Sequence, residues 1–245
     1  MRYEIDLGER PSLIYITLNS PIEQKVGFLG HDATKKDTFY FARTKSVKGK
    51  TVIEFPMPIA PKILTIDLNV PDGKFGSYIN VVDIKVKEFV NNKVVAFPKD
   101  TLEFYNFLKR FCQQAGYIKP GFYTSKDENF VIWAKPHLDD DGTPARVNRR
   151  TGVIKMNLSK IKDYTIPMRM FIGLHEYFHY AYQTTNEVKA DMGALKVYLD
   201  AGFPKSEANY AMTKIFDNSK SAVQRVSVLH NYIKNYGNNN ISYKK

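Results

Sequence analysis

The period of the hydrophobic pattern changes near Pro98, and this change constrains the fold more than any other feature of the chain. Before it, apolar residues recur in short runs separated by turn residues such as Pro71-Asp72-Gly73, which is typical of β-strands. After it, apolar residues recur with helical spacing. We therefore predict an α+β chain divided near residue 97, into residues 1–97 and residues 98–245.

Seven runs of apolar and β-branched residues in the first part are predicted to be strands. They cover residues 3–7, 13–18, 39–42, 52–55, 63–70, 79–82 and 84–90. Short strands at this spacing favour an antiparallel β-sandwich, immunoglobulin-like in architecture but without its disulfide. Such a module usually binds, so we expect it to contact protein partners of an assembly. His31, beside Asp32, is expected to lie in a polar turn.

The second part is predicted to begin with a helix. Asp100 is the expected N-cap, and Glu103 completes a capping box for a helix that runs to about Ala115, with Gly116 ending it. Strands are expected at residues 122–124, 130–134 and 153–157, the first two as a hairpin. Four helices follow at about residues 165–182, 187–201, 206–216 and 221–236, and Thr165 is the expected cap of the first. The tail 237–245 is expected to be disordered.

Two histidines lie four positions apart in the first of these four helices, within His175-Glu176-Tyr177-Phe178-His179. On a helix this spacing places both rings on one face, where they can bind one zinc ion. Glu176 would then lie beside the open position of the metal and take a proton from a water that attacks a peptide carbonyl. The neighbouring residues are apolar or uncharged, so these polar groups would be buried there without reason unless a cation were bound.

A second signal follows this motif. Asn186 is a good N-cap, and Glu187 and Asp191 lie at i and i+4 on the helix that it begins. Glu187 is predicted to be the third metal ligand. Asp191, which has a shorter reach, is predicted to accept the outward N–H of a ligating histidine, although Asp191 as the third ligand stays an alternative. Carboxylates in a first turn also favour the positive end of any helix.

These residues resemble a family. HEYFH followed by NEVKAD is similar to the zincin metallopeptidases of the gluzincin type, whose pattern is HExxH followed by a downstream NExxxD or ExxAD. The resemblance implies that His175, His179 and Glu187 bind zinc. It also implies that Glu176 acts as general base and then general acid, and that Asp191 supports a histidine from behind.

The spacing within the motif is shorter than in thermolysin-like members of that family. Seven residues separate His179 from Glu187, so a tight turn must bring the second helix back to the metal. The metzincin pattern is excluded, because Tyr182 and Thr185 stand where it requires glycine and histidine. The order of helix, small sheet and motif helix also resembles a zincin core, which implies that residues 153–157 form the edge strand that pairs with extended substrate.

Two further features concern the cleft. An oxyanion donor is expected downstream, and His230 and Tyr210 are the candidates. The polar loop of residues 137–152 contains three consecutive aspartates, Asp139 to Asp141, but lacks the alternation by which carboxylates converge on calcium. We interpret it as a solvated loop, with the hypothesis that it acts as a lid over the cleft.

Composition limits the classes of partner. The net charge is +11, but the lysines are spread along the chain, so nucleic acid is not expected as a direct ligand. The single cysteine, Cys112, excludes an intramolecular disulfide and is expected to be buried on a helix. Residues 1–6 carry charges where a signal peptide would be apolar, and 18 apolar residues nowhere follow one another. We expect a cytoplasmic or virion-associated protein without a membrane segment.

Two functions therefore stay open. The first is a zinc metalloendopeptidase that acts on a protein or peptide substrate. The second is a structural protein that keeps a zincin fold, since a β-sandwich joined to a compact zincin-like domain resembles components of the neck or tail ring of a tailed-phage virion. Glu176 favours the first, because a scaffold needs no general base. A basic nucleic-acid-associated protein is a weaker alternative, which would show binding that falls steeply with salt.

Overall fold

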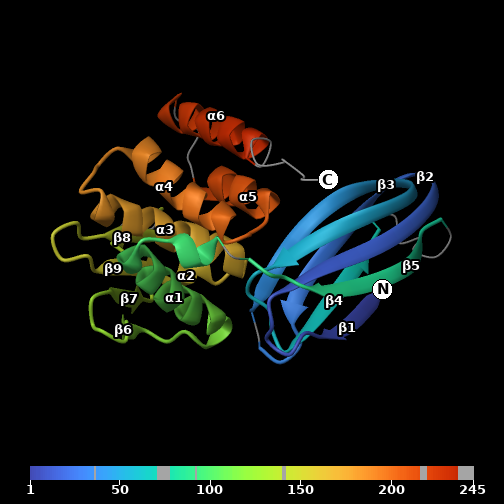
Figure 1. Ribbon diagram of the computed structural model, residues 1–245, viewed down its shortest axis with the longest axis horizontal. Helices are drawn as coiled ribbons and strands as arrows, with labels where there is room; N and C mark the ends of the chain where they lie inside the picture. The colour runs from blue at the N-terminus through green and yellow to red at the C-terminus, as the bar shows by residue number, and fades with distance from the viewer. Residues whose placement is uncertain (36, 71–77, 92, 140–141, 216–219, 237–245) are drawn as a thin grey trace.

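The computed structural model describes residues 1–35, 37–70, 78–91, 93–139, 142–215 and 220–236. Two β-sheets and six α-helices lie in these ranges, so the α+β prediction is confirmed. Figure 1 shows sheet A, built from the first part of the chain, on one side of the molecule, with sheet B and the helices on the other. The tail 237–245 and Asp140 and Asp141 lie outside the described residues.

Sheet A is antiparallel, and β2 is the strand that organises it. β2 pairs with β3 along most of its length, while its other edge pairs first with β5 and then with β4. β1 joins the sheet through β4. Its five strands are β1 (Arg2–Asp6), β2 (Ser12–Asp32), β3 (Phe39–Met57), β4 (Ile63–Asn69) and β5 (Asn80–Glu88).

The prediction of seven strands is wrong, because polar stretches inside two long strands resemble turns in the sequence. Residues 43–51 of β3 are mostly polar and accessible, yet they continue to pair with β2, since a backbone ladder does not need apolar side chains. The predicted strands 39–42 and 52–55 are thus parts of β3, and 79–82 and 84–90 overlap the single strand β5. The described strands of the first part of the chain form one hydrogen-bonded sheet, so the immunoglobulin-like sandwich is not confirmed.

Irregular positions in β2 explain the other local differences. A register shift between Ser20 and Gln24 accommodates Pro21, which cannot donate to the ladder. His31 lies in β2 and not in a turn, with its Nε2 atom 3.1 Å from Asp67 Oδ2. Asp67 also accepts two hydrogen bonds from Arg2, so His31 belongs to a small ionic cluster on β1, β2 and β4.

The helix α1 (Lys99–Gln113) follows a short 3-10 turn, η1 (Val94–Ala96). It begins two residues earlier than expected, with Pro98 as N-cap and no side-chain capping bond, so the prediction of a capping box formed by Asp100 and Glu103 is wrong. Glu103 instead accepts hydrogen bonds from Ser125 Oγ and Asn129 Nδ2, at 3.2 and 3.1 Å, which ties α1 to the turn of the next hairpin. Cys112 is fully buried in α1 as predicted, and burial raises its pKa to about 12.

Sheet B has the strand order β6-β7-β9-β8. The strands are β6 (Gly121–Thr124), β7 (Val131–Lys135), β8 (Ala145–Val147) and β9 (Ile154–Asn157), and the predicted hairpin is β6–β7. β9 pairs with both β7 and β8, so the prediction that residues 153–157 form the edge strand is wrong. The edge belongs to β8, whose three residues inside the predicted loop are too few to show a strand period.

The remaining helices pack around α3, which is buried along most of its length and has no broad solvent-exposed face. α3 contacts α1, α4, α5, β8 and β9. The predicted caps are confirmed: Thr165 Oγ1 accepts from Met168 N at 3.4 Å, and Asn186 Oδ1 accepts from Lys189 N at 3.0 Å. The helices are α2 (Leu158–Ile161), α3 (Ile166–Ala181), α4 (Glu187–Asp200), α5 (Lys205–Ile215) and α6 (Lys220–Asn235).

One hydrophobic core joins residues of both predicted parts. Polar contacts accompany it: Arg43 of β3 donates to Ser206 Oγ at 2.9 Å, and Asn91 donates to the Asp200 carbonyl oxygen at 2.6 Å. The division near residue 97 stays a prediction about independent folding, because the two parts pack against each other. No helix of the described chain is long and apolar enough to cross a membrane.

Candidate metal centre

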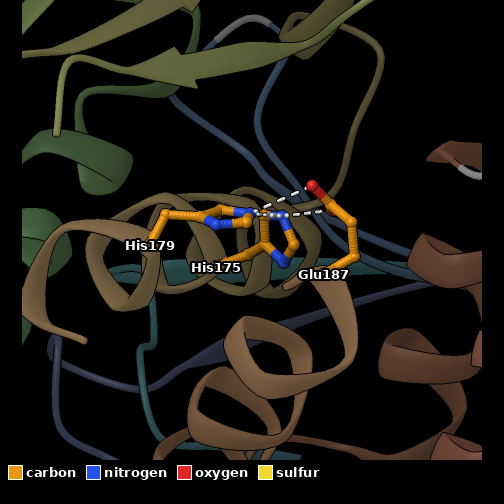
Figure 2. Close-up of side chains that lie close together, drawn as sticks. All are labelled: His175, His179 and Glu187. Carbon is orange, nitrogen blue, oxygen red and sulfur yellow. Dashed lines mark hydrogen bonds and ion pairs between the residues drawn. The ribbon is translucent and has the colours of Figure 1, made fainter. Parts of the chain in front are cut away.

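The two motif histidines lie on one face of α3, one turn apart. Their Nε2 atoms are 3.0 Å from each other, as expected from the i, i+4 spacing. Figure 2 shows both rings turned toward Glu187, which comes from the beginning of the neighbouring helix α4. Apolar packing on the other faces of α3 fixes the position of these two rings.

A tight turn returns the chain from α3 to α4. Gln183 adopts a φ of 46°, in the left-handed region, and Thr184 N donates to the His179 carbonyl oxygen at 3.1 Å. This turn places Glu187 Oε2 at 3.3 Å from His175 Nε2, and Glu187 Oε1 at 3.4 Å from His179 Nε2. The structure therefore brings together the three predicted ligand residues, whose candidate ligand atoms lie within 4.8 Å of one another.

The spacing of these atoms fits a tetrahedral metal site. Two ligand atoms about 2.0–2.1 Å from a zinc ion, at the tetrahedral angle, lie about 3.3 Å apart. The distance of 3.0 Å between the two Nε2 atoms is close to that value. Each histidine also has one oxygen of Glu187 at a similar distance, Oε2 at 3.3 Å from His175 and Oε1 at 3.4 Å from His179. Two imidazole nitrogens and one carboxylate are also the ligands that catalytic zinc sites use, with a fourth position left for water or substrate.

The outward nitrogen of each histidine faces an acceptor. His175 Nδ1 lies 2.8 Å from Asp191 Oδ1, and His179 Nδ1 lies 2.9 Å from the carbonyl oxygen of Thr184. Asp191 has no exposed surface. The contact of His179 meets hydrogen-bond geometry, whereas that of His175 is a short contact without it. Both Nε2 atoms face the common centre, which is the arrangement that supports metal ligation. Asp191 thus lies where the sequence predicted it.

Glu176 lies beside this centre and contacts sheet B. Its Oε2 atom accepts a hydrogen bond of 2.8 Å from the backbone N–H of Val147, in the edge strand β8. Burial raises the pKa of the Glu176 carboxyl, against the lowering effect of the nearby histidines. A carboxylate whose pKa is raised toward neutrality is better matched to accepting and returning a proton.

The histidines and Glu187 form a strongly coupled ionic cluster. Burial lowers the pKa of His175, but contacts with Asp191 and Glu187 outweigh burial and raise it to about 10. The contact with Glu187 likewise raises the pKa of His179. Hydrogen bonds from both histidines hold the pKa of Glu187 far below its usual range. A cation at the centre would replace these protons, because ligand histidines must be neutral.

Arg225, on α6, is a site residue that the sequence analysis missed. Its Nε and Nη2 atoms lie 2.8 and 3.1 Å from the two carboxylate oxygens of Asp191, and Nη2 also lies 3.0 Å from Glu187 Oε2. It is separated from Asp191 by 34 positions, so no local spacing connects them. One chemical signal for it was available in the sequence. Glu187 and Asp191 are two carboxylates on one helix face, and burying both would require a positively charged side chain in addition to a metal ion.

A cavity of about 610 Å³ opens onto the centre between β8, α3, α4 and α6. Arg146, Arg149 and Thr143 line it on the side of β8, within the predicted polar loop. Neither predicted oxyanion donor is among the described lining residues: Tyr210 lines a second hollow beside sheet A, and His230 is exposed on α6. The sequence could not show whether Tyr210 or His230 reaches the cavity, because the position of a residue on a helix does not reveal which neighbouring element it faces.

Comparison with known proteins gave no match, whether with protein-family models, with curated proteins or with solved structures.

Proposed function

We propose that this chain is a zinc-dependent metallopeptidase that hydrolyses peptide bonds. One observation carries the proposal: candidate ligand atoms of His175, His179 and Glu187 lie within 4.8 Å of one another, beside the buried carboxylate of Glu176, in an accessible cavity. This combination supports hydrolysis more than mere storage of a metal, because a structural zinc site needs four protein ligands and no adjacent base.

The roles of the residues follow from their positions. His175, His179 and Glu187 would hold the zinc ion, which when bound supplies Lewis acidity and lowers the pKa of water. Glu176 accepts a proton from the attacking water and then donates it to the nitrogen of the leaving amine. The N–H of Val147 binds one oxygen of Glu176 and so holds the carboxylate in one orientation.

The edge strand β8 is the proposed binding site for an extended peptide or protein segment. Asn148 N donates to the Val153 carbonyl oxygen, and Asn157 N donates to the Pro144 carbonyl oxygen, so alternate residues of this strand bond to β9. The backbone groups of Ala145 and the carbonyl oxygen of Val147 therefore point to the open side, along the cavity, while the N–H of Val147 is bound to Glu176. A peptide added there would extend sheet B.

Zinc content and activity test the proposal together. We expect about one zinc ion per wild-type chain and loss of that ion in His179→Ala. Glu176→Gln should keep the zinc and lose peptidase activity on a mixed peptide library by about 10²- to 10⁴-fold, the usual contribution of a general base. A wild-type chain that binds no zinc when zinc is supplied, or a Glu176→Gln variant with full activity, would contradict the proposal.

The second candidate function is an assembly component, such as a virion ring protein, that retains this fold. It is favoured by exposed apolar residues on sheet A, where Val82 and Val86 of β5 are 56% and 44% exposed. Sedimentation at several concentrations would separate the two functions. A ring of fixed size that forms equally well with Glu176→Gln and without zinc favours assembly, whereas an active monomer excludes it.

A further inference from the structure

We propose that Arg225 is a positioning residue of the metal centre: its guanidinium holds the carboxylates of Glu187 and Asp191 in the geometry that binds a metal ion, and so couples α6 to the site. The inference deepens the proposed function and rests on it, because it requires a metal ion at His175, His179 and Glu187.

The contacts of Arg225 are those of a two-point clamp. The Nε and Nη2 atoms reach both oxygens of Asp191, at 2.8 and 3.1 Å, in the parallel arrangement that a planar guanidinium prefers with a carboxylate. The same Nη2 lies 3.0 Å from Glu187 Oε2. The side chain of Arg225 is only 16% exposed, and that of Asp191 is not exposed. One rigid group thus fixes two side chains of α4 relative to each other.

Both of these carboxylates contact the ring of His175. Asp191 Oδ1 lies 2.8 Å from His175 Nδ1 and also receives Nη2 of Arg225, while Glu187 Oε2 lies 3.3 Å from His175 Nε2. A displacement of Arg225 would therefore release the carboxylate behind the ring and the carboxylate in front of it. With Oε2 bound to Arg225, Oε1 of Glu187 is the oxygen that faces His179 and is best placed for the metal.

Electrostatic repulsion alone predicts the opposite effect of Arg225 on metal affinity, so a measurement of that affinity tests the proposal. A guanidinium close to a bound cation repels it, so removing Arg225 would tighten metal binding if charge alone mattered. Positioning predicts weaker binding. The charge balance of the site also requires Arg225. With both histidines neutral, the three negative charges of Glu176, Glu187 and Asp191 are neutralised by a divalent ion together with Arg225.

The test is the zinc affinity of the full chain, measured by competition with a chromophoric chelator. We expect Arg225→Met to weaken zinc binding by about 10- to 100-fold, the usual effect of losing a group that orients a ligand. Arg225→Lys should recover only part of the affinity, because an ammonium keeps the positive charge but cannot contact both carboxylates in the same fork geometry. Lys234→Ala, which removes a charge from the exposed end of α6, should bind zinc as the wild type does.

Cobalt substitution gives a readout that a general loss of stability would not produce. At saturating cobalt, Arg225→Met should change the visible absorption of the ion, because Glu187 no longer coordinates in one orientation, while the far-ultraviolet circular dichroism stays that of the wild type. If Arg225→Met fails to fold, the pair Asp191→Asn and Asp191→Asn/Arg225→Met replaces it, since removing both charges leaves no unpaired buried ion. The double variant should then bind zinc more weakly than Asp191→Asn.

The outcomes separate this inference from the proposed function. A wild-type chain without zinc overturns both. A wild-type chain that binds zinc, with an Arg225→Met variant that binds it equally or more tightly and has an unchanged cobalt spectrum, overturns the role of Arg225 alone. Equal affinity of the double variant and Asp191→Asn has the same meaning.

Discussion

At the scale of single residues, the candidate site combines ligands that a sequence motif reveals with supports that it does not. His175, His179 and Glu187 meet because helix periodicity and one N-cap at Asn186 fix their positions locally. Arg225 could not be predicted in the same way. It belongs to a different helix, and only the packing of α6 against α4 brings its side chain to Asp191.

The protonation of His175 gives a prediction about pH. Its pKa in the zinc-free protein is raised from 6.5 to about 10, so its contribution to stability is fully present below about pH 6.5 and is lost as the pH rises through about 10. We expect the thermal midpoint of the zinc-free protein to fall between pH 7 and pH 10 more steeply than that of His175→Asn. Added zinc should raise the midpoint more at the alkaline end, because protons no longer compete for the ring.

Scanning calorimetry of both chains, with and without zinc, checks this. Parallel profiles for the wild type and His175→Asn would show that the histidine does not gain a proton on folding.

At the scale of elements, short-range signals predicted the helices well and the strands poorly. Caps at Thr165 and Asn186 and the apolar period placed α3 and α4 within a few residues of the predicted bounds. β8 escaped prediction because it has three residues and is a strand only through its pairing with β9. The number of strands in sheet A was mispredicted for a similar reason. The polar stretch of β3 is a strand because it pairs with β2, and its own sequence does not identify that partner.

The edge strand gives a prediction at this scale. Val147→Pro removes the N–H that donates to Glu176 but does not remove a bond to β9, because that N–H points away from β9. We expect activity to fall by about tenfold or more, since a hydrogen bond to a charged group contributes roughly 1.5–3 kcal/mol. The zinc content should not change.

Steady-state kinetics with one peptide substrate, together with metal analysis, would show this. Val147→Ala, which keeps the N–H, is the matched control. Equal losses in the two variants would mean that the valine side chain, and not its N–H, is what matters.

At the scale of the whole molecule, the end of β5 and the end of α4 meet across the two parts of the chain. Gly202 has a φ of +84°, and a Cβ atom added there would collide with the ring of Phe89. Asn91 binds the carbonyl oxygen of Asp200 in the same region, at 2.6 Å. The contact joins sheet A to the helix that supplies Glu187.

A pair of glycine substitutions measures that contact. Gly49→Ala should cost about 1–2 kcal/mol of unfolding free energy, from the left-handed backbone alone, because nothing lies within 4 Å of the added atom. Gly202→Ala should cost a further 1–3 kcal/mol or so, because the Phe89 ring must also move. Urea unfolding of both variants gives the comparison. Equal losses would mean that the two parts do not press on each other there.

The pairing of β1 with β4 determines when the first strand can form as the chain is synthesised. Arg2 pairs with Asp67, so the first strand waits for about 65 further residues, which take roughly 3 to 13 s at ordinary translation rates. The metal centre waits longer still, because α6 follows every other element that lines it. If the chain has the proposed peptidase activity and that activity requires α6, the chain cannot cut its neighbours, or itself, while it is being made.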